Sequence, residues 1–215
     1  MRTPIVIAGA GRHSRELCSY LASHPDFGLI GVLDDAKPPG AFEQTRLLGP
    51  IECLTEIVRS NQGLRFITAF GSNETRLSVV RRIEGLRLTA LPAVVVDRLA
   101  YVGLNVEIGD GTLLAPGAVV TTKVRIGRHC IINVKASVSH DCQISDFANL
   151  NPGATVCGDV CIGEGAYIGA GATIIDKISV GAWSIIGAGA VVVRDIPAHV
   201  TAVGVPARIV KKRLG

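Results

Sequence analysis

Written six residues at a time, residues 132–167 read INVKAS, VSHDCQ, ISDFAN, LNPGAT, VCGDVC and IGEGAY. Every group begins with an aliphatic residue, and the same register runs unbroken from Val102 to Val192. A small or β-branched residue stands four places after each aliphatic one. An α-helix repeats every 3.6 residues and a strand every two, so a period of six fits neither element alone. This period predicts a solenoid.

The hexapeptide period predicts a parallel β-helix, in which three short strands and three corners close each triangular coil. We expect the aliphatic side chains to fill the interior and the small residues, Cys130 and Cys142 among them, to leave room for them. Glycine often follows the aliphatic residue, as at Gly109 and Gly163, and is expected to adopt corner dihedral angles that a Cβ atom disfavours. A β-sandwich would instead show turn signals every ~8–12 residues.

A different pattern precedes the repeats, because apolar runs alternate with helical segments. The expected strands are residues 4–8, 29–33, 65–70 and 86–91, and the expected helices follow Gly11 or cover residues 53–60 and 74–84. Such alternation predicts an α/β domain with a small parallel, Rossmann-like sheet.

The end of the chain is rich in Pro and Gly, which break the hexapeptide register after Pro197. A solenoid needs a cover over its exposed apolar end, so we interpret this tail as a cap. The sequence therefore predicts three parts: an α/β domain at residues 1–91, a β-helix at 92–197 and a tail at 198–215.

Polar loops follow three of the expected strands, namely Gly9–His13, Asp34–Asp35 and Gly71–Asn73. Ligands of parallel α/β sheets bind beyond the carboxyl ends of the strands, so these loops are expected to line one crevice. The separation of Gly11 and Asp34 is close to the ~20 residues expected in nucleotide-binding folds. Ser14 takes the last place of a GxGxxG pattern, which argues against a dinucleotide ligand.

Composition excludes several classes of protein. The net charge is +4, charges of both signs are scattered, and 4% of residues are aromatic, which argues against a nucleic-acid partner. No segment resembles a signal peptide or is apolar over membrane-spanning length, so we expect a cytoplasmic protein without a membrane partner. Six cysteines form no CxxC pair and no zinc-like cluster with histidine, so no metal is expected.

His140 and Asp141 form the sharpest candidate pair for chemistry. Acyl transfer to an amine or alcohol needs a base that works near pH 7, and histidine has an unperturbed pKa of ~6.5. A neighbouring carboxylate can fix the tautomer of the ring. The alternative is a solvated corner histidine beside an incidental acid. No Ser or Cys with an adjoining base points to an acyl-enzyme.

The segment Ile132–Cys142, the hexapeptides and the Gly-Val-Pro-Ala segment at 204–207 resemble the left-handed β-helix acyltransferases. Essentially the whole chain is similar to one branch, the sugar acetyltransferases that join a nucleotide-binding domain to a β-helix. That branch includes N-acetyltransferases of nucleotide-linked 4-amino sugars and sialic acid O-acetyltransferases. The resemblance implies a left-handed coil, acetyl-CoA as cosubstrate, no metal, and a homotrimer with sites between neighbours.

The resemblance also implies roles for single residues. His140 would be the general base, Asp141 its orienting acid and the Gly158 amide the oxyanion donor. Asn149, Gly158, Ala170 and Ala188 would contact acetyl-CoA. The nucleotide would be bound by Gly9, Gly11, Arg12, His13, Asp34, Asp35, Lys37 and Asn73. Arg12 and Ser14 stand where the family commonly has Gly or Ala, and Leu91-Pro92 replaces its His-Pro.

We therefore predict an acetyl-CoA-dependent N-acetyltransferase of a UDP-, GDP- or dTDP-linked 4-amino-deoxysugar, acting in bacterial surface glycan synthesis by direct transfer in a ternary complex. One alternative is O-acetylation of sialic acid or a related sugar. A second is a non-catalytic scaffold that binds nucleotide sugars. A carbonic-anhydrase-type β-helix would need three zinc-binding histidines on neighbouring coils, and His129 with His140 does not supply them.

Overall fold

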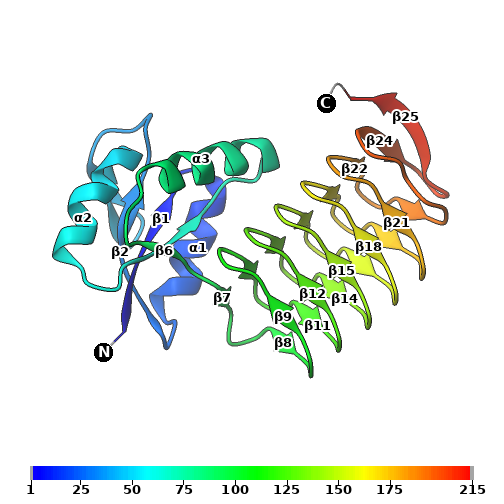
Figure 1. Ribbon diagram of the computed structural model, residues 1–215, viewed down its shortest axis with the longest axis horizontal. Coiled ribbons are helices and arrows are strands. Elements are labelled where there is room, and N and C mark those ends of the chain that lie inside the picture. The colour runs from blue at the N-terminus through cyan, green and yellow to red at the C-terminus, as the bar shows by residue number, and fades with distance from the viewer. Residues whose placement is uncertain (1, 214–215) are drawn as a thin grey trace. The chain divides into compact units, whose positions relative to one another are not determined.

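The computed structural model describes residues 2–213 and shows two compact units, Met1–Val94 and Val95–Gly215 (Figure 1). The first unit is an α/β domain and the second a left-handed parallel β-helix, so the predicted fold classes are confirmed.

The first unit is built on a six-stranded sheet of order β3-β4-β2-β1-β5-β6. Its strands are β1 (Thr3–Ala8), β2 (Phe27–Leu33), β3 (Gly40–Phe42), β4 (Thr45–Gly49), β5 (Arg65–Thr68) and β6 (Leu91–Pro92). Its helices are α1 (Arg12–Ala22), the 3₁₀-helix η1 (Ile51–Cys53), α2 (Leu54–Ser60) and α3 (Asn73–Gly85). Val6, Ala8 and Phe66 of the central strands pack with Leu54 and Ile83 of the helices in one buried cluster.

Two predictions for the first unit were wrong or incomplete. The expected strand at 86–91 is wrong, because the amides of Leu86 and Arg87 bond back to the carbonyls of Ile83 and Glu84 at the end of α3. Only Leu91–Pro92 joins the sheet, beside β5. The sheet is also not purely parallel, because β3 and β4 form an antiparallel hairpin that the sequence did not predict.

The β-helix consists of two-residue strands on three faces of a triangular prism, stacked coil upon coil (Figure 1). From β7 to β24 each strand pairs in parallel with the strand one coil away, as Leu114 does with Ile132.

Face 1 holds β7 (Val95–Val96), β10 (Leu113–Leu114), β13 (Ile131–Ile132), β16 (Asn149–Leu150), β19 (Tyr167–Ile168), β22 (Ile185–Ile186), β24 (Val200–Val203) and β25 (Arg208–Lys212). Face 2 holds β8 (Tyr101–Val102), β11 (Val119–Val120), β14 (Ser137–Val138), β17 (Thr155–Val156), β20 (Thr173–Ile174) and β23 (Val191–Val192). Face 3 holds β9 (Glu107–Ile108), β12 (Arg125–Ile126), β15 (Gln143–Ile144), β18 (Cys161–Ile162) and β21 (Ser179–Val180).

The interior of the β-helix is filled as the hexapeptide period predicts. From Leu114 to Val192 every register residue is buried, and Cys130 and Cys142 are buried core residues. The first register residue, Val102, is an exception, because it lies in the outermost coil and is 37% exposed.

The predicted reason for the repeated glycines was wrong. The left-handed conformation occurs three residues after the aliphatic one, where Asn105, Lys135 and Asp141 adopt it as well as glycine. Gly163, directly after an aliphatic residue, is needed for space instead. A Cβ atom built on it would lie 2.5 Å from the backbone nitrogen of Ala182 in the next coil. Close stacking of the coils, and not dihedral freedom, therefore selects glycine at this position.

The tail continues the solenoid for one more strand and then turns back. β24 pairs in parallel with β22, and β25 pairs antiparallel with β24. Val200, Ala202 and Ala207 are buried and belong to the same apolar cluster as the β-helix interior.

The close stacking of the coils predicts that two glycine substitutions differ in their effect on the free energy of unfolding. Gly163→Ala should lower the free energy of unfolding by ~2–3 kcal/mol, because two backbones must move apart. Gly171→Asn should cost ~1 kcal/mol or less, because Gly171 has a φ of +65° and open space around it. Urea unfolding followed by circular dichroism measures both; equal losses would contradict the stacking explanation.

Candidate functional site

The His140–Asp141 pair lies on the corner between face 2 and face 3, in the turn from β14 to β15. His140 Nδ1 is 2.9 Å from Asp141 Oδ2, and the two side chains are 59% and 51% exposed. Asp141 occupies the left-handed corner position, with a φ of 58°. The structure thus brings the predicted pair into direct contact at a solvent-accessible corner. Asp141 contacts only Nδ1 of the ring, so it leaves Nε2 available to another group.

Gly158 lies at the same corner one coil further on, between β17 and β18. A Cβ atom built on it would lie 2.6 Å from Cε1 and 2.7 Å from Nε2 of His140, so the ring packs directly against the glycine. In the described part of the chain no acceptor is found for the Gly158 N–H, as is usual for this corner position. A histidine nitrogen and a free backbone amide therefore lie side by side.

A shallow groove on face 2 adjoins this corner. It has a volume of ≈ 290 Å³ and is lined by residues in or directly after three neighbouring strands of face 2: Thr121, Ser137, Val138, Ser139, Thr155, Val156 and Cys157. The hydroxyl groups and the half-buried Cys157 were not singled out in the sequence. They share no motif, and only the pairing of β14 with β11 on one side and β17 on the other brings them together.

The other predicted acetyl-CoA residues do not join this corner within one chain. Asn149 is a buried residue of β16 on face 1. Ala170 and Ala188 are exposed on the corner between face 1 and face 2. One chain thus places the predicted residues on different edges of the prism.

In the first unit, the glycine loop and the loop after β2 meet as predicted. The Ala10 N–H donates to Asp34 Oδ2 at 2.7 Å, and Asp34 Oδ1 accepts from the Ala36 N–H at 3.0 Å. The Lys37 ammonium donates to the Ala10 carbonyl. Gly9 has a φ of 105°, and a Cβ atom there would lie 2.8 Å from the ring of Phe70. Loops after three different strands therefore pack together.

The α1 helix begins directly after this loop, and its N-cap residue Gly11 provides no side-chain cap. First-turn amides have no intrahelical acceptor and favour an anion. Arg12 is exposed beside them. Asn73 instead lies buried in the first turn of α3, where its Oδ1 accepts from Arg76 at 3.0 Å. The Arg76 guanidinium also donates to the Phe70 carbonyl at 2.9 Å, which ties the loop after β5 to α3.

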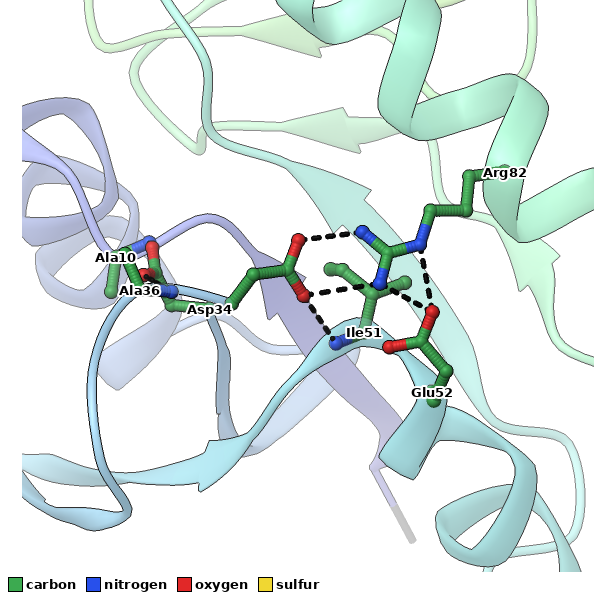
Figure 2. A network of polar contacts seen from close by, with 7 residues as sticks. Ala10, Asp34, Ala36, Ile51, Glu52 and Arg82 are labelled. Atoms are coloured by element: carbon green, nitrogen blue, oxygen red, sulfur yellow. Dashed lines mark hydrogen bonds and ion pairs between the residues drawn. The ribbon is translucent and has the colours of Figure 1, made fainter.

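Asp35 belongs to an ion-pair network with Arg82 and Glu52 (Figure 2). Arg82 Nη1 is 2.6 Å from Asp35 Oδ2, and Arg82 Nε is 2.8 Å from Glu52 Oε1. The hydrogen bond from Arg82 holds the pKa of Asp35 below its usual value, with help from the Ile51 N–H. Sequence reasoning missed Arg82 and Glu52, because they lie far from Asp35 in the chain and belong to no motif.

His13 is largely buried at the start of α1, where its Nδ1 is 3.2 Å from Glu16 Oε2. Its Nε2 is buried and has no hydrogen-bond partner among the described residues. Burial lowers the pKa of His13, although Glu16 acts in the opposite direction. The ring is therefore neutral near pH 7.

Residues 2–213 offer neither a cluster of metal ligands nor a membrane-spanning helix. No group of three or more His, Cys, Asp or Glu residues is arranged to hold a metal ion. No helix in this range is long and apolar enough to cross a membrane.

Two family models match the chain. The PglD N-terminal domain matches residues 4–83, and the bacterial transferase hexapeptide model, with six repeats, matches residues 141–176. No curated protein matches the chain by sequence.

Solved structures match over nearly the whole chain. PerB from Caulobacter crescentus, in complex with CoA and GDP-perosamine, is 32% identical with a TM-score of 0.87 and 97% coverage of both chains. The acetyltransferase domain of PglB from Neisseria gonorrhoeae, in complex with acetyl coenzyme A, is 27% identical with a TM-score of 0.88, covering 98% of this chain and all of that one. WeeI from Acinetobacter baumannii is 28% identical with a TM-score of 0.80, at 97% and 100% coverage.

The lowered pKa of His13 predicts a pH dependence of stability. Below the unfolded-state pKa of ~6.5 the unfolded chain takes up a proton that the folded chain resists, so the free energy of unfolding falls as pH falls. His13→Asn should flatten this part of the curve between pH 7 and pH 5. Urea unfolding across that range measures the slope; identical slopes in the two proteins would contradict the buried neutral ring.

Proposed function

Because the chain belongs to the family of acetyl-CoA-dependent sugar acetyltransferases that join a PglD-type N-terminal domain to a hexapeptide β-helix, we propose that it acetylates the amine of a nucleotide-linked amino sugar. The observation that carries the proposal is the contact of His140 with both Asp141 and Gly158. PerB, a relative of the same architecture, is seen with CoA and GDP-perosamine, an amino-sugar nucleotide.

The chemistry follows from the geometry at His140. With Nδ1–H donating to Asp141, Nε2 carries the lone pair that takes a proton from the attacking amine. The imidazolium that forms is stabilised by the adjacent carboxylate. The amine nitrogen bonds to the thioester carbon, the C–S bond breaks, and the departing thiolate of CoA recovers a proton. The step needs no acyl-enzyme.

Gly158 contributes in two ways. The absence of a side chain leaves room for the His140 ring, and its N–H has no acceptor among the described residues. A preorganised amide donor stabilises negative charge that develops on the thioester oxygen, and removal of such a donor typically costs ~10²–10³-fold in rate. In this proposal the thioester lies along the groove from Thr121 to Cys157.

The distribution of the predicted acetyl-CoA residues supports a homotrimer. Asn149 lies on face 1, and Ala170 and Ala188 lie on the corner between face 1 and face 2, so a ligand that touches both these residues and His140 is held between two copies. The outward residues of face 2 at its first coils are apolar and exposed, with Tyr101 at 60% and Val119 at 36%. Association of copies would cover this surface, and a closed ring of three gives three equivalent sites.

In the first unit, the nucleotide diphosphate is proposed to bind at the glycine loop. The first-turn amides of α1 and the exposed Arg12 favour phosphate oxygens. Asp34 and Lys37 shape the loop through their hydrogen bonds to Ala10 and do not project freely toward a ligand.

Kinetics test the catalytic assignment. His140→Ala should lower kcat for acetylation by ~10²–10⁴-fold, because it removes the proposed general base. Gly158→Ala should give a large loss as well, since its methyl group displaces the His140 ring. Thiol release from acetyl-CoA is followed with GDP-, UDP- and dTDP-linked 4-amino sugars and with free sialic acid.

Gly63→Asn serves as the control for glycine substitution and should keep full activity, because Gly63 has a φ of +73°, has open space around it and belongs to neither proposed site. Turnover of sialic acid alone would move the protein to O-acetylation. Silence of the wild type toward every sugar would refute the proposed reaction, and full activity of His140→Ala would refute the proposed base.

Association is tested separately on two faces. Val119→Lys should turn a trimer into monomers and abolish activity, because it places a charge on the apolar part of face 2. Ser179→Lys, on the polar face 3, should leave both unchanged. Sedimentation velocity measures the mass; a wild-type monomer that is active would contradict the shared site.

A further inference from the structure

Arg82 stands out among the groups that the proposed reaction does not use. It lies near the end of α3, it is 40% exposed on its side chain, and it bridges two carboxylates that are 46% and 54% exposed. Exposed ion pairs typically contribute only ~0–1 kcal/mol to stability, so fold stability alone is a weak explanation for the network. Its place is informative, because Asp35 directly follows Asp34, which bonds to the glycine loop.

The network leaves a defined pair of hydrogen-bonding groups unused. Arg82 donates from Nε to Glu52 and from Nη2 to both Glu52 and Asp35 Oδ1. Nη1 uses one of its two N–H groups on Asp35 Oδ2, so one N–H remains. Asp35 Oδ1 also accepts from the Ile51 N–H, whereas Oδ2 accepts only from Arg82. A free donor and a free acceptor therefore lie next to each other.

A nucleobase with a keto oxygen beside a ring N–H matches this pair. The carbonyl oxygen would accept from Arg82 Nη1, and the ring N–H would donate to Asp35 Oδ2. Guanine, uracil and thymine present this edge. In adenine and cytosine an amino group replaces the keto oxygen and an unprotonated ring nitrogen replaces the N–H. The acidic ring N–H is the better partner for an ionised carboxylate, and Asp35 stays ionised because Arg82 keeps its pKa low.

We propose that Arg82 is a specificity-determining residue of the nucleotide site, which fixes the Asp35 carboxylate and reads the keto oxygen of guanine, uracil or thymine beside it. This inference rests on the proposed function, because it assumes that a nucleotide binds at the carboxyl edge of the first unit's sheet. Arg82 acts here on recognition of the base and not on acetyl transfer.

The experiment compares Arg82→Met and Arg82→Lys with wild type as full-length proteins. Inhibition constants of GDP, UDP, dTDP, ADP and CDP are measured against the sugar nucleotide. Wild type should bind at least one keto-base nucleotide ~10-fold or more tighter than ADP and CDP. Arg82→Met should reduce this preference to about twofold and raise the KM for the sugar nucleotide, with kcat and the KM for acetyl-CoA unchanged. Arg82→Lys keeps the positive charge but loses the planar guanidinium that makes several hydrogen bonds at once. Its preference for keto-base nucleotides should lie between those of wild type and Arg82→Met.

Glu52→Gln is the matched control, because it removes a neighbouring charge while Arg82 still pairs with Asp35. Its preference among bases should equal that of wild type. An unchanged preference in Arg82→Met, or a loss spread equally over kcat and both KM values, would overturn the inference while leaving the proposed reaction intact. Failure of wild type to bind any of the five nucleotides would overturn both.

Discussion

Close stacking of the coils governs both the core and the candidate site of the β-helix. Each two-residue strand is too short to persist alone, and it is stable because it pairs with the strands one coil above and below. Stacking buries one continuous apolar column and leaves no space for a Cβ atom at Gly163 and similar positions. The same stacking sets the ring of His140 against Gly158, so the packing rule that builds the fold also builds the candidate site.

The two units use polar groups differently. In the β-helix the candidate pair is formed by neighbouring residues on an exposed corner, and its partner glycine lies one coil away. In the first unit the polar contacts join segments that are distant in sequence: Asp34 reaches Ala10, and Arg82 reaches both Asp35 and Glu52. The ion pairs of Arg82 are exposed and add little stability, whereas the hydrogen bond between Asp34 and Ala10 is partly buried. Their effect is to orient groups at the carboxyl edge of the sheet, where ligands of such folds bind.

Periodicity was a reliable guide because it reports local burial repeated many times. It failed where a single tertiary contact decides the structure. The hairpin of β3 and β4 has no long apolar run, so its pairing was not visible in the sequence. The strand expected at 86–91 was wrong because capping hydrogen bonds at the end of α3 took up the amides of Leu86 and Arg87. The role of Gly163 was misread because the neighbouring backbone belongs to the next coil.

The β-helix, the α/β unit before it and the His140–Asp141 pair could be predicted from the sequence, because periodicity and adjacency are properties of the order of residues along the chain. Only the packed structure shows that the His140 ring rests on Gly158, that Asn149, Ala170 and Ala188 lie away from the His140 corner, and that Asp35 is held by Arg82. Those facts depend on which residues meet when coils stack and helices pack. Such meetings join residues that are far apart in sequence, so no local pattern records them.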